Sequence, residues 1–260
     1  NETGVDGFRC DYATGVPTVF WNEVGAQLRK VKPDVFLLAE AEVPQHQLHG
    51  FNAAYSFGMM HVINDIAKKT KTVAAIDVEL AKNETLFPTG STFINYTTNH
   101  DENSWQGTVF ERLGSGVKAF GVVTYLLDGI PLIYNGQETG LDKRLEFFTR
   151  DPIEWRHDEL AAFYQTLNQL RRDNRALHTG SRFVRIPTTA NDAIFAVLRE
   201  AQGRRVLAWV NLTDAAVSFE LAHAEVAGKW TDVFSGKSET FARGSLLTLE
   251  PWEFRVLTGN

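Results

Sequence analysis

Residues 5–11, Val-Asp-Gly-Phe-Arg-Cys-Asp, and residues 35–40, Val-Phe-Leu-Leu-Ala-Glu, carry the pattern from which the fold follows. Both read as short strands, the second of them a continuous apolar run of the buried type, and both end on a carboxylate. Between them, apolar residues recur at helical spacing from Phe20 to Val31, and Lys32-Pro33 ends that pattern. A strand, a helix and a second strand in this order predict a parallel β/α unit.

The same alternation continues through the first two thirds of the chain. The expected strands are 51–57, 93–97 and 131–134, and the expected helices are 59–69, 115–127 and 158–174. Polar residues follow the strands directly, namely Asp11, Glu40, His100-Asp101 and Gln137-Glu138. The carboxyl ends of parallel strands meet at one face, and in a (β/α)8 barrel that face carries the active site. We therefore expect part of such a barrel, with functional side chains gathered at this face.

The last third of the chain has a different pattern. Short strand candidates separated by turn residues lie at 183–186, 193–199, 206–211, 217–221, 230–234, 246–249 and 254–257. No helical pattern of convincing length lies between them, which predicts an antiparallel all-β sandwich. We place the barrel portion at residues 1–175 and the sandwich at residues 176–260.

Composition excludes several classes of protein. The chain is 43% hydrophobic, which is too much for a disordered chain, and no apolar run approaches the roughly 18 residues of a membrane-spanning helix. A net charge of −6 argues against nucleic acid or an anionic membrane as a partner. The single cysteine, Cys10, excludes an internal disulfide and a cysteine-ligated metal site.

Two carboxylates on neighbouring strand ends suit the cleavage of a glycosidic bond, because one must attack the anomeric carbon while the other protonates the leaving oxygen. Arg9 lies two residues before Asp11, so both side chains point to the same face of the strand. A guanidinium lowers the pKa of a neighbouring carboxyl, which suits Asp11 as the nucleophile. Glu40 has no cation adjacent in sequence, and its apolar surroundings favour the protonated form that a general acid requires.

His100 and Asp101 would supply a hydrogen-bond donor and an acceptor for sugar hydroxyls near the developing positive charge. Any one of these polar residues alone reads as a cap or a turn residue, and their joint occurrence on one face favours an active site. Trp105, four residues after Asp101, fits a ring that stacks on a sugar at the cleft rim, and it fits an aromatic loop anchor equally well.

Several segments resemble the conserved regions of the α-amylase family, family 13 of the glycoside hydrolases. They are Gly7-Phe8-Arg9-Cys10-Asp11-Tyr12-Ala13, Leu38-Ala39-Glu40-Ala41 and Thr98-Asn99-His100-Asp101, together with 128–138, which resembles the family's eighth strand, and 150–155. The resemblance covers essentially the whole chain. It implies a partial (β/α)8 barrel of about strands 4 to 8, followed by the family's all-β C-terminal domain. The N-terminal half-barrel of a parent enzyme is then a missing partner.

The resemblance also implies residue roles: Asp11 as nucleophile, Glu40 as general acid/base, Asp101 as transition-state stabiliser, Arg9 as the group that orients Asp11, and His100 as a contact to glucose. The implied activity is a retaining hydrolase acting on an α-glucan oligosaccharide or polysaccharide. An α-glucan transglycosylase that uses the same residues stays open. So does an inactive fragment with a structural or carbohydrate-binding role, because the barrel is incomplete.

No cofactor is expected. Many amylases carry Lys-His just after the nucleophile, where the histidine helps to hold calcium or substrate. Here Ala13-Thr14-Gly15 occupies that stretch, so the residues present do not support a calcium site of that type, and we assign no metal ligand.

Overall fold

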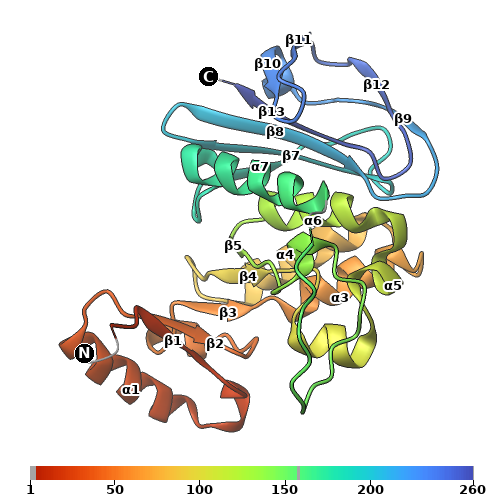
Figure 1. Ribbon diagram of the computed structural model, residues 1–260. Coiled ribbons are helices and arrows are strands. Elements are labelled where there is room, and N and C mark those ends of the chain that lie inside the picture. The colour runs from red at the N-terminus through yellow and green to blue at the C-terminus, as the bar shows by residue number, and fades with distance from the viewer. Residues whose placement is uncertain (1–3, 157–158, 260) are drawn as a thin grey trace.

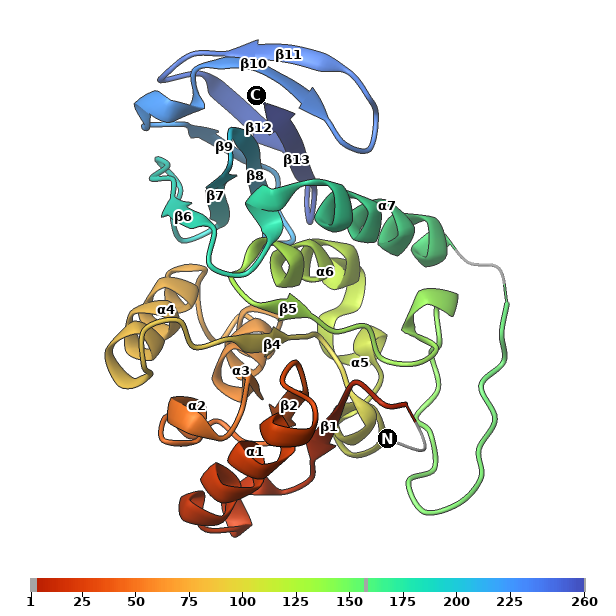
Figure 2. The same ribbon diagram turned by 90° about the vertical axis from the view of Figure 1, so that its left-hand side faces the viewer.

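Five parallel strands form the first sheet of the structure, a computed structural model that describes residues 4–156 and 159–259. In chain order they are β1 (Gly7–Cys10), β2 (Phe36–Ala39), β3 (Ala53–Tyr55), β4 (Phe93–Asn95) and β5 (Ile130–Pro131). Each strand pairs in parallel with the next one in the chain. Helices connect the strands (Figures 1 and 2), which confirms the expected partial barrel.

The helices of this part are α1 (Thr18–Val31), α2 (His46–His49), α3 (Phe57–Ala67), α4 (Ala74–Leu86), α5 (Val109–Leu113), α6 (Val117–Leu126) and α7 (Glu159–Asp173). A five-residue π-helix, η2 (Glu102–Gln106), follows β4. The last helix was expected from Asp158, which lies outside the described residues. No described helix combines the length and the apolar character needed to cross a membrane.

The end of the parallel sheet differs from the prediction. We expected a strand over Pro131–Tyr134, but β5 pairs with β4 only through Ile130 and Pro131. Proline has no N–H to donate to the ladder. The next ladder hydrogen bond runs from Leu132 N to Asn95 O at 2.8 Å, and the strand pairing ends there. Among the described residues, β1 and β5 each have one neighbouring strand, so both are edges of the sheet.

The remaining strands form two antiparallel sheets, which confirms the expected all-β part. The strands are β6 (Arg182–Arg185), β7 (Ile194–Ala201), β8 (Arg204–Asn211), β9 (Val217–Glu220), β10 (Gly228–Asp232), β11 (Ser238–Phe241), β12 (Leu246–Leu249) and β13 (Phe254–Gly259). Six strands pair in the order β11-β10-β13-β8-β7-β6, and β12 pairs with β9. The sandwich is therefore unequal, with one large and one small sheet.

The central strands β7 and β8 of the six-stranded sheet are buried on both faces. On one face, Val197 and Ala208 belong to the same core cluster as Phe120 of α6 and Leu167 of α7. On the other face, Leu198, Leu207 and Trp209 pack with Phe219 of β9 and Leu249 of β12. Figure 1 shows α6 and α7 lying between this sheet and the parallel strands. One continuous core thus joins the barrel portion to the sandwich, while the exact division at residue 175 stays a prediction.

Candidate active site

The register of the parallel sheet brings the two main carboxylates together. Cys10 of β1 pairs with Ala39 of β2, so Asp11 and Glu40 are the next residues on neighbouring strands. The pairing continues past the strand ends, because Glu40 N donates to Cys10 O at 3.0 Å. Tyr12 then adopts φ +43°, in the left-handed region, and its N–H donates to Glu40 Oε2 at 2.7 Å. A strained tyrosine of this kind costs of the order of 1–3 kcal/mol and is common at functional sites.

A single guanidinium bridges the two carboxylates. Arg9 Nη1 lies 2.7 Å from Asp11 Oδ1, and Arg9 Nη2 donates to Glu40 Oε1. No cation adjoins Glu40 in sequence, yet the fold places the Arg9 guanidinium beside it. Arg9 is far from Glu40 in the sequence. The parallel register brings the two side chains together, because it pairs Arg9 with Leu38, two residues before Glu40. The Arg9 guanidinium also lies 5.9 Å from the ring centroid of Tyr55.

The charge of Asp11 is stabilised by its neighbours. The hydrogen bond from Arg9 holds the pKa of the Asp11 carboxyl below its usual value, with smaller contributions from a hydrogen bond with Glu40 and from the charge of His100. The side chain of Asp11 is 80% exposed, so an incoming substrate can reach it. An ionised and accessible carboxylate is what nucleophilic attack requires.

The turn after β4 brings a third and a fourth polar group to the same place. Asn99 is buried, and its Oδ1 accepts from Glu102 N at 2.8 Å, which turns the chain so that His100 and Asp101 face the strand ends. His100 Nε2 lies 3.4 Å from Asp101 Oδ2. Ligand-type atoms of Glu40, His100 and Asp101 lie within 4.8 Å of one another. The structure thus brings together Arg9, Asp11, Glu40, His100 and Asp101.

The same three residues are the group in the described chain that could in principle hold a metal ion. Glu40 already forms an ion pair with Arg9, so a cation bound there would have to compete with a guanidinium. Exposed acidic groups are common without a metal, and we assign none here. Our expectation that no cofactor is needed stays a prediction.

Trp105 lies on η2 and is 54% exposed. Its ring centroid is 5.1 Å from that of Phe147 and 6.0 Å from that of Phe148. Phe147 in turn stacks on His100 at 5.9 Å with an interplanar angle of 25°. Sequence reasoning missed both phenylalanines. The available signal was an adjacent aromatic pair inside the otherwise charged loop 142–151.

Removing Arg9 should change how the site responds to acid. Arg9 keeps the pKa of Asp11 low, so Asp11 stays ionised well into the acid range. In Arg9→Leu that pKa rises, and the acid limb of the kcat/KM profile should therefore move to higher pH, while Arg9→Lys should move it less. The measurement is the pH profile of the full-length protein, meaning the complete gene product that contains this chain. An acid limb that stays in place would contradict this account of Asp11.

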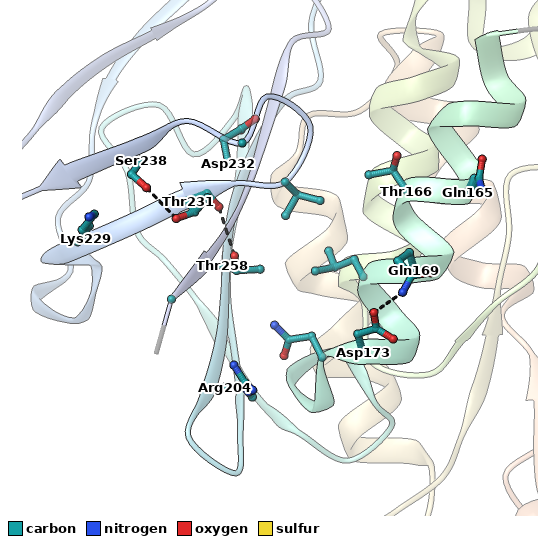
Figure 3. A pocket seen from close by; sticks show the side chains of 15 residues that line it. Gln165, Thr166, Gln169, Asp173, Arg204, Lys229, Thr231, Asp232, Ser238 and Thr258 are labelled. Atoms are coloured by element: carbon teal, nitrogen blue, oxygen red, sulfur yellow. Dashed lines mark hydrogen bonds between the residues drawn. The ribbon is translucent and has the colours of Figure 1, made fainter.

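A separate groove of about 1230 Å³ lies between α7 and the six-stranded sheet (Figure 3). Its polar lining residues include Gln165, Thr166 and Gln169 of α7 and Lys229, Thr231 and Ser238 of β10 and β11, and Leu170 and Val233 add apolar surface. None of the residues that line the groove belongs to the cluster of Arg9, Asp11, Glu40, His100 and Asp101.

Comparisons with known proteins show similarity along most of the chain. Residues 184–256 match the family described as maltogenic amylase, C-terminal domain. Alpha-amylase 2 of Dictyoglomus thermophilum is 28% identical, over 92% of this chain and 44% of that protein. A cyclomaltodextrinase of a Bacillus species is 30% identical, over 81% of this chain and 39% of that protein.

Solved structures share the fold. A maltogenic α-amylase of Thermotoga neapolitana has a TM-score of 0.87 at 20% identity, and the match covers 99% of this chain and 62% of that one. A cyclomaltodextrinase structure has a TM-score of 0.83 at 25% identity, covering 99% of this chain and 46% of that one.

Parallel strands with two carboxylates just after their carboxyl ends, followed by an all-β domain, place the chain in the architectural class of the amylase structures above. Within that class, the chain belongs to the α-amylase family and corresponds to the C-terminal portion of its members. It spans less than half the length of the two curated relatives described above.

Proposed function

We propose that this chain carries the catalytic residues of a retaining glycoside hydrolase that acts on α-glucans. The observation behind the proposal is the Arg9 guanidinium, which binds Asp11 and Glu40 at once. Retaining enzymes hold their two carboxyl groups about 5–5.5 Å apart, whereas inverting enzymes need about 6.5–9.5 Å to admit a water. Two carboxylates that share one guanidinium favour the shorter separation.

In the first step, an Asp11 carboxylate oxygen attacks the anomeric carbon while the bond to the leaving oxygen breaks. Glu40 gives its proton to that oxygen, so the shortened glucan leaves as a neutral alcohol. The sugar is then held as an ester of Asp11. In the second step, Glu40 takes a proton from water, the resulting hydroxide attacks the same carbon, and Asp11 is released as a carboxylate.

Charge builds on the sugar ring in both transition states, which resemble an oxocarbenium ion. Asp101 is the remaining carboxylate of the cluster, and it would stabilise that positive charge. His100 Nε2 lies 3.4 Å from Asp101 and would donate to a sugar hydroxyl. These two roles come from the position of the residues and from the family resemblance.

The configuration of the first product tests the mechanism. Proton NMR of maltoheptaose hydrolysis by the full-length protein should show the α-anomer first, with the β-anomer appearing only through mutarotation. Initial release of the β-anomer would contradict double displacement through Asp11. Maltotriose distinguishes the acceptor: products no longer than maltotriose indicate hydrolysis, and longer products indicate that the glycosyl group passes to a second sugar.

A further inference from the structure

We propose that Trp105, Phe147 and Phe148 form an aromatic platform that binds an α-glucan chain beyond the sugars at the scissile bond. The proposal rests on the function proposed above and specifies its substrate class. That class is maltooligosaccharides and starch chains long enough to reach the platform, as opposed to single α-glucosides.

The platform begins at the catalytic cluster and leads away from it. Phe147 stacks on His100 at 5.9 Å, and Trp105 and Phe148 lie 5.1 Å and 5.0 Å from Phe147. Exposure is 40% for Phe147, 54% for Trp105 and 84% for Phe148. If the sugar at the scissile bond lies against His100, the next sugars of a glucan that extends toward Phe147 would contact these aromatic rings.

The two segments that carry the rings are joined by hydrogen bonds. Asn103 is 2% exposed and binds the loop twice, because Nδ2 donates to Lys143 O at 3.1 Å and Oδ1 accepts from Leu145 N at 2.8 Å. Ser104 Oγ donates to Leu145 O at 2.7 Å. These bonds tie η2, which carries Trp105, to the loop that carries both phenylalanines. A platform ordered in advance loses little conformational entropy when a flexible chain binds.

The chemistry of the rings and of their position favours a sugar chain as the ligand. An exposed aromatic patch beside polar groups marks a binding site more often than a structural contact. The flat C–H faces of glucose pack on aromatic rings, while its hydroxyls project sideways toward polar groups. The rim of this patch offers such groups, since Arg144 pairs with Glu111 and Lys143 pairs with Asp151 beside it. A loop anchor would bury its rings, but Phe148 is 84% exposed.

Chain-length preference of the full-length protein tests the platform. We expect Trp105→Ala and Phe148→Ala each to lower the ratio of kcat/KM for maltoheptaose to that for maltotriose by about tenfold. Trp105→Phe, which keeps a ring, should largely restore the ratio. Phe20→Ala removes an equally exposed ring, 51% exposed on α1, and should leave the ratio unchanged. A ratio unaffected by both platform variants would overturn the proposal.

A binding measurement separates failure of the platform from failure of the proposed function. In a Glu40→Gln background, calorimetry should give a Kd for maltoheptaose about tenfold higher once Phe148 is alanine. An unchanged Kd would overturn the platform, for instance if another segment of the protein covers these rings. If the wild type cleaves no α-glucan, the proposed function fails, yet this Kd comparison still decides the platform.

Discussion

Asp11→Asn in the full-length protein should lower kcat on maltooligosaccharides by about 10⁴-fold or more, because it removes the group that forms the covalent intermediate. Glu40→Gln should lower kcat by about 10²–10⁴-fold, the range typical of a lost general acid. Steady-state kinetics on maltoheptaose measure both losses. Asp6→Asn is a matched control, since Asp6 precedes the same strand, is 98% exposed and should be neutral.

Azide distinguishes the two roles in the corresponding alanine variants. In Asp11→Ala, azide can occupy the space of the missing carboxylate, attack opposite the leaving group and give a β-glycosyl azide. In Glu40→Ala, azide would attack the Asp11 ester from the other side and give the α-glycosyl azide. The same azide anomer from both variants, or high activity in the Asn and Gln variants, would contradict the assigned roles.

Arg199→Met should destabilise the fold strongly. Arg199 is fully buried on β7, and it donates to Leu126 O and to Asp128 Oδ1, both at 2.8 Å, in the barrel portion. It also donates to Ser181 Oγ at 2.6 Å and to His178 O at 3.2 Å. Methionine fills part of the space but removes all of these donated hydrogen bonds from a buried position, at a cost of about 3 kcal/mol or more. We expect a fall in Tm of about 6–12 °C, measured by calorimetry at one scan rate.

Arg182→Met is the control for Arg199. Arg182 lies on the neighbouring strand and pairs with two carboxylates, those of Glu200 and Glu225, but its side chain is 47% exposed. Water replaces such partners readily, so the Tm should change little. Similar Tm shifts for the two variants would show that burial and the contacts to the barrel portion are not what makes Arg199 important.

Most helices and strands could be predicted because the buried residues of a helix or a strand recur at a regular spacing in the sequence. The strand 246–249 was located to the residue, and α1 and α7 to within two residues among those described. Helix α4 was not found, because its buried residues, Ile76, Glu79 and Asn83, include two polar ones and leave no apolar stripe. Strand β11 was missed since it holds one buried apolar residue, Phe241, at the edge of its sheet.

The proximity of the predicted site residues followed from the sequence pattern, but their contacts did not. Asp11, Glu40 and Asp101 follow strands, and the order of a parallel sheet places such residues on one face. Whether Arg9 binds one carboxylate or both depends on side-chain directions across the strands, which no local pattern encodes. Phe147 and Phe148 belong to a loop whose path is fixed by the hydrogen bonds of Asn103, and these join residues about 40 positions apart.

The six-stranded sheet, whose central strands are buried on both faces, limits which segments of this protein could be transferred to another protein. The stretch recognised as a family domain, residues 184–256, owes the burial of one face to α6 and α7, which precede it in the chain. Cut out alone, it would expose Val197, Ala208 and their neighbours to water. A graft onto another protein would therefore need matching side chains on the receiving helices. The stretch that matches the family model is therefore smaller than the stretch that encloses this core.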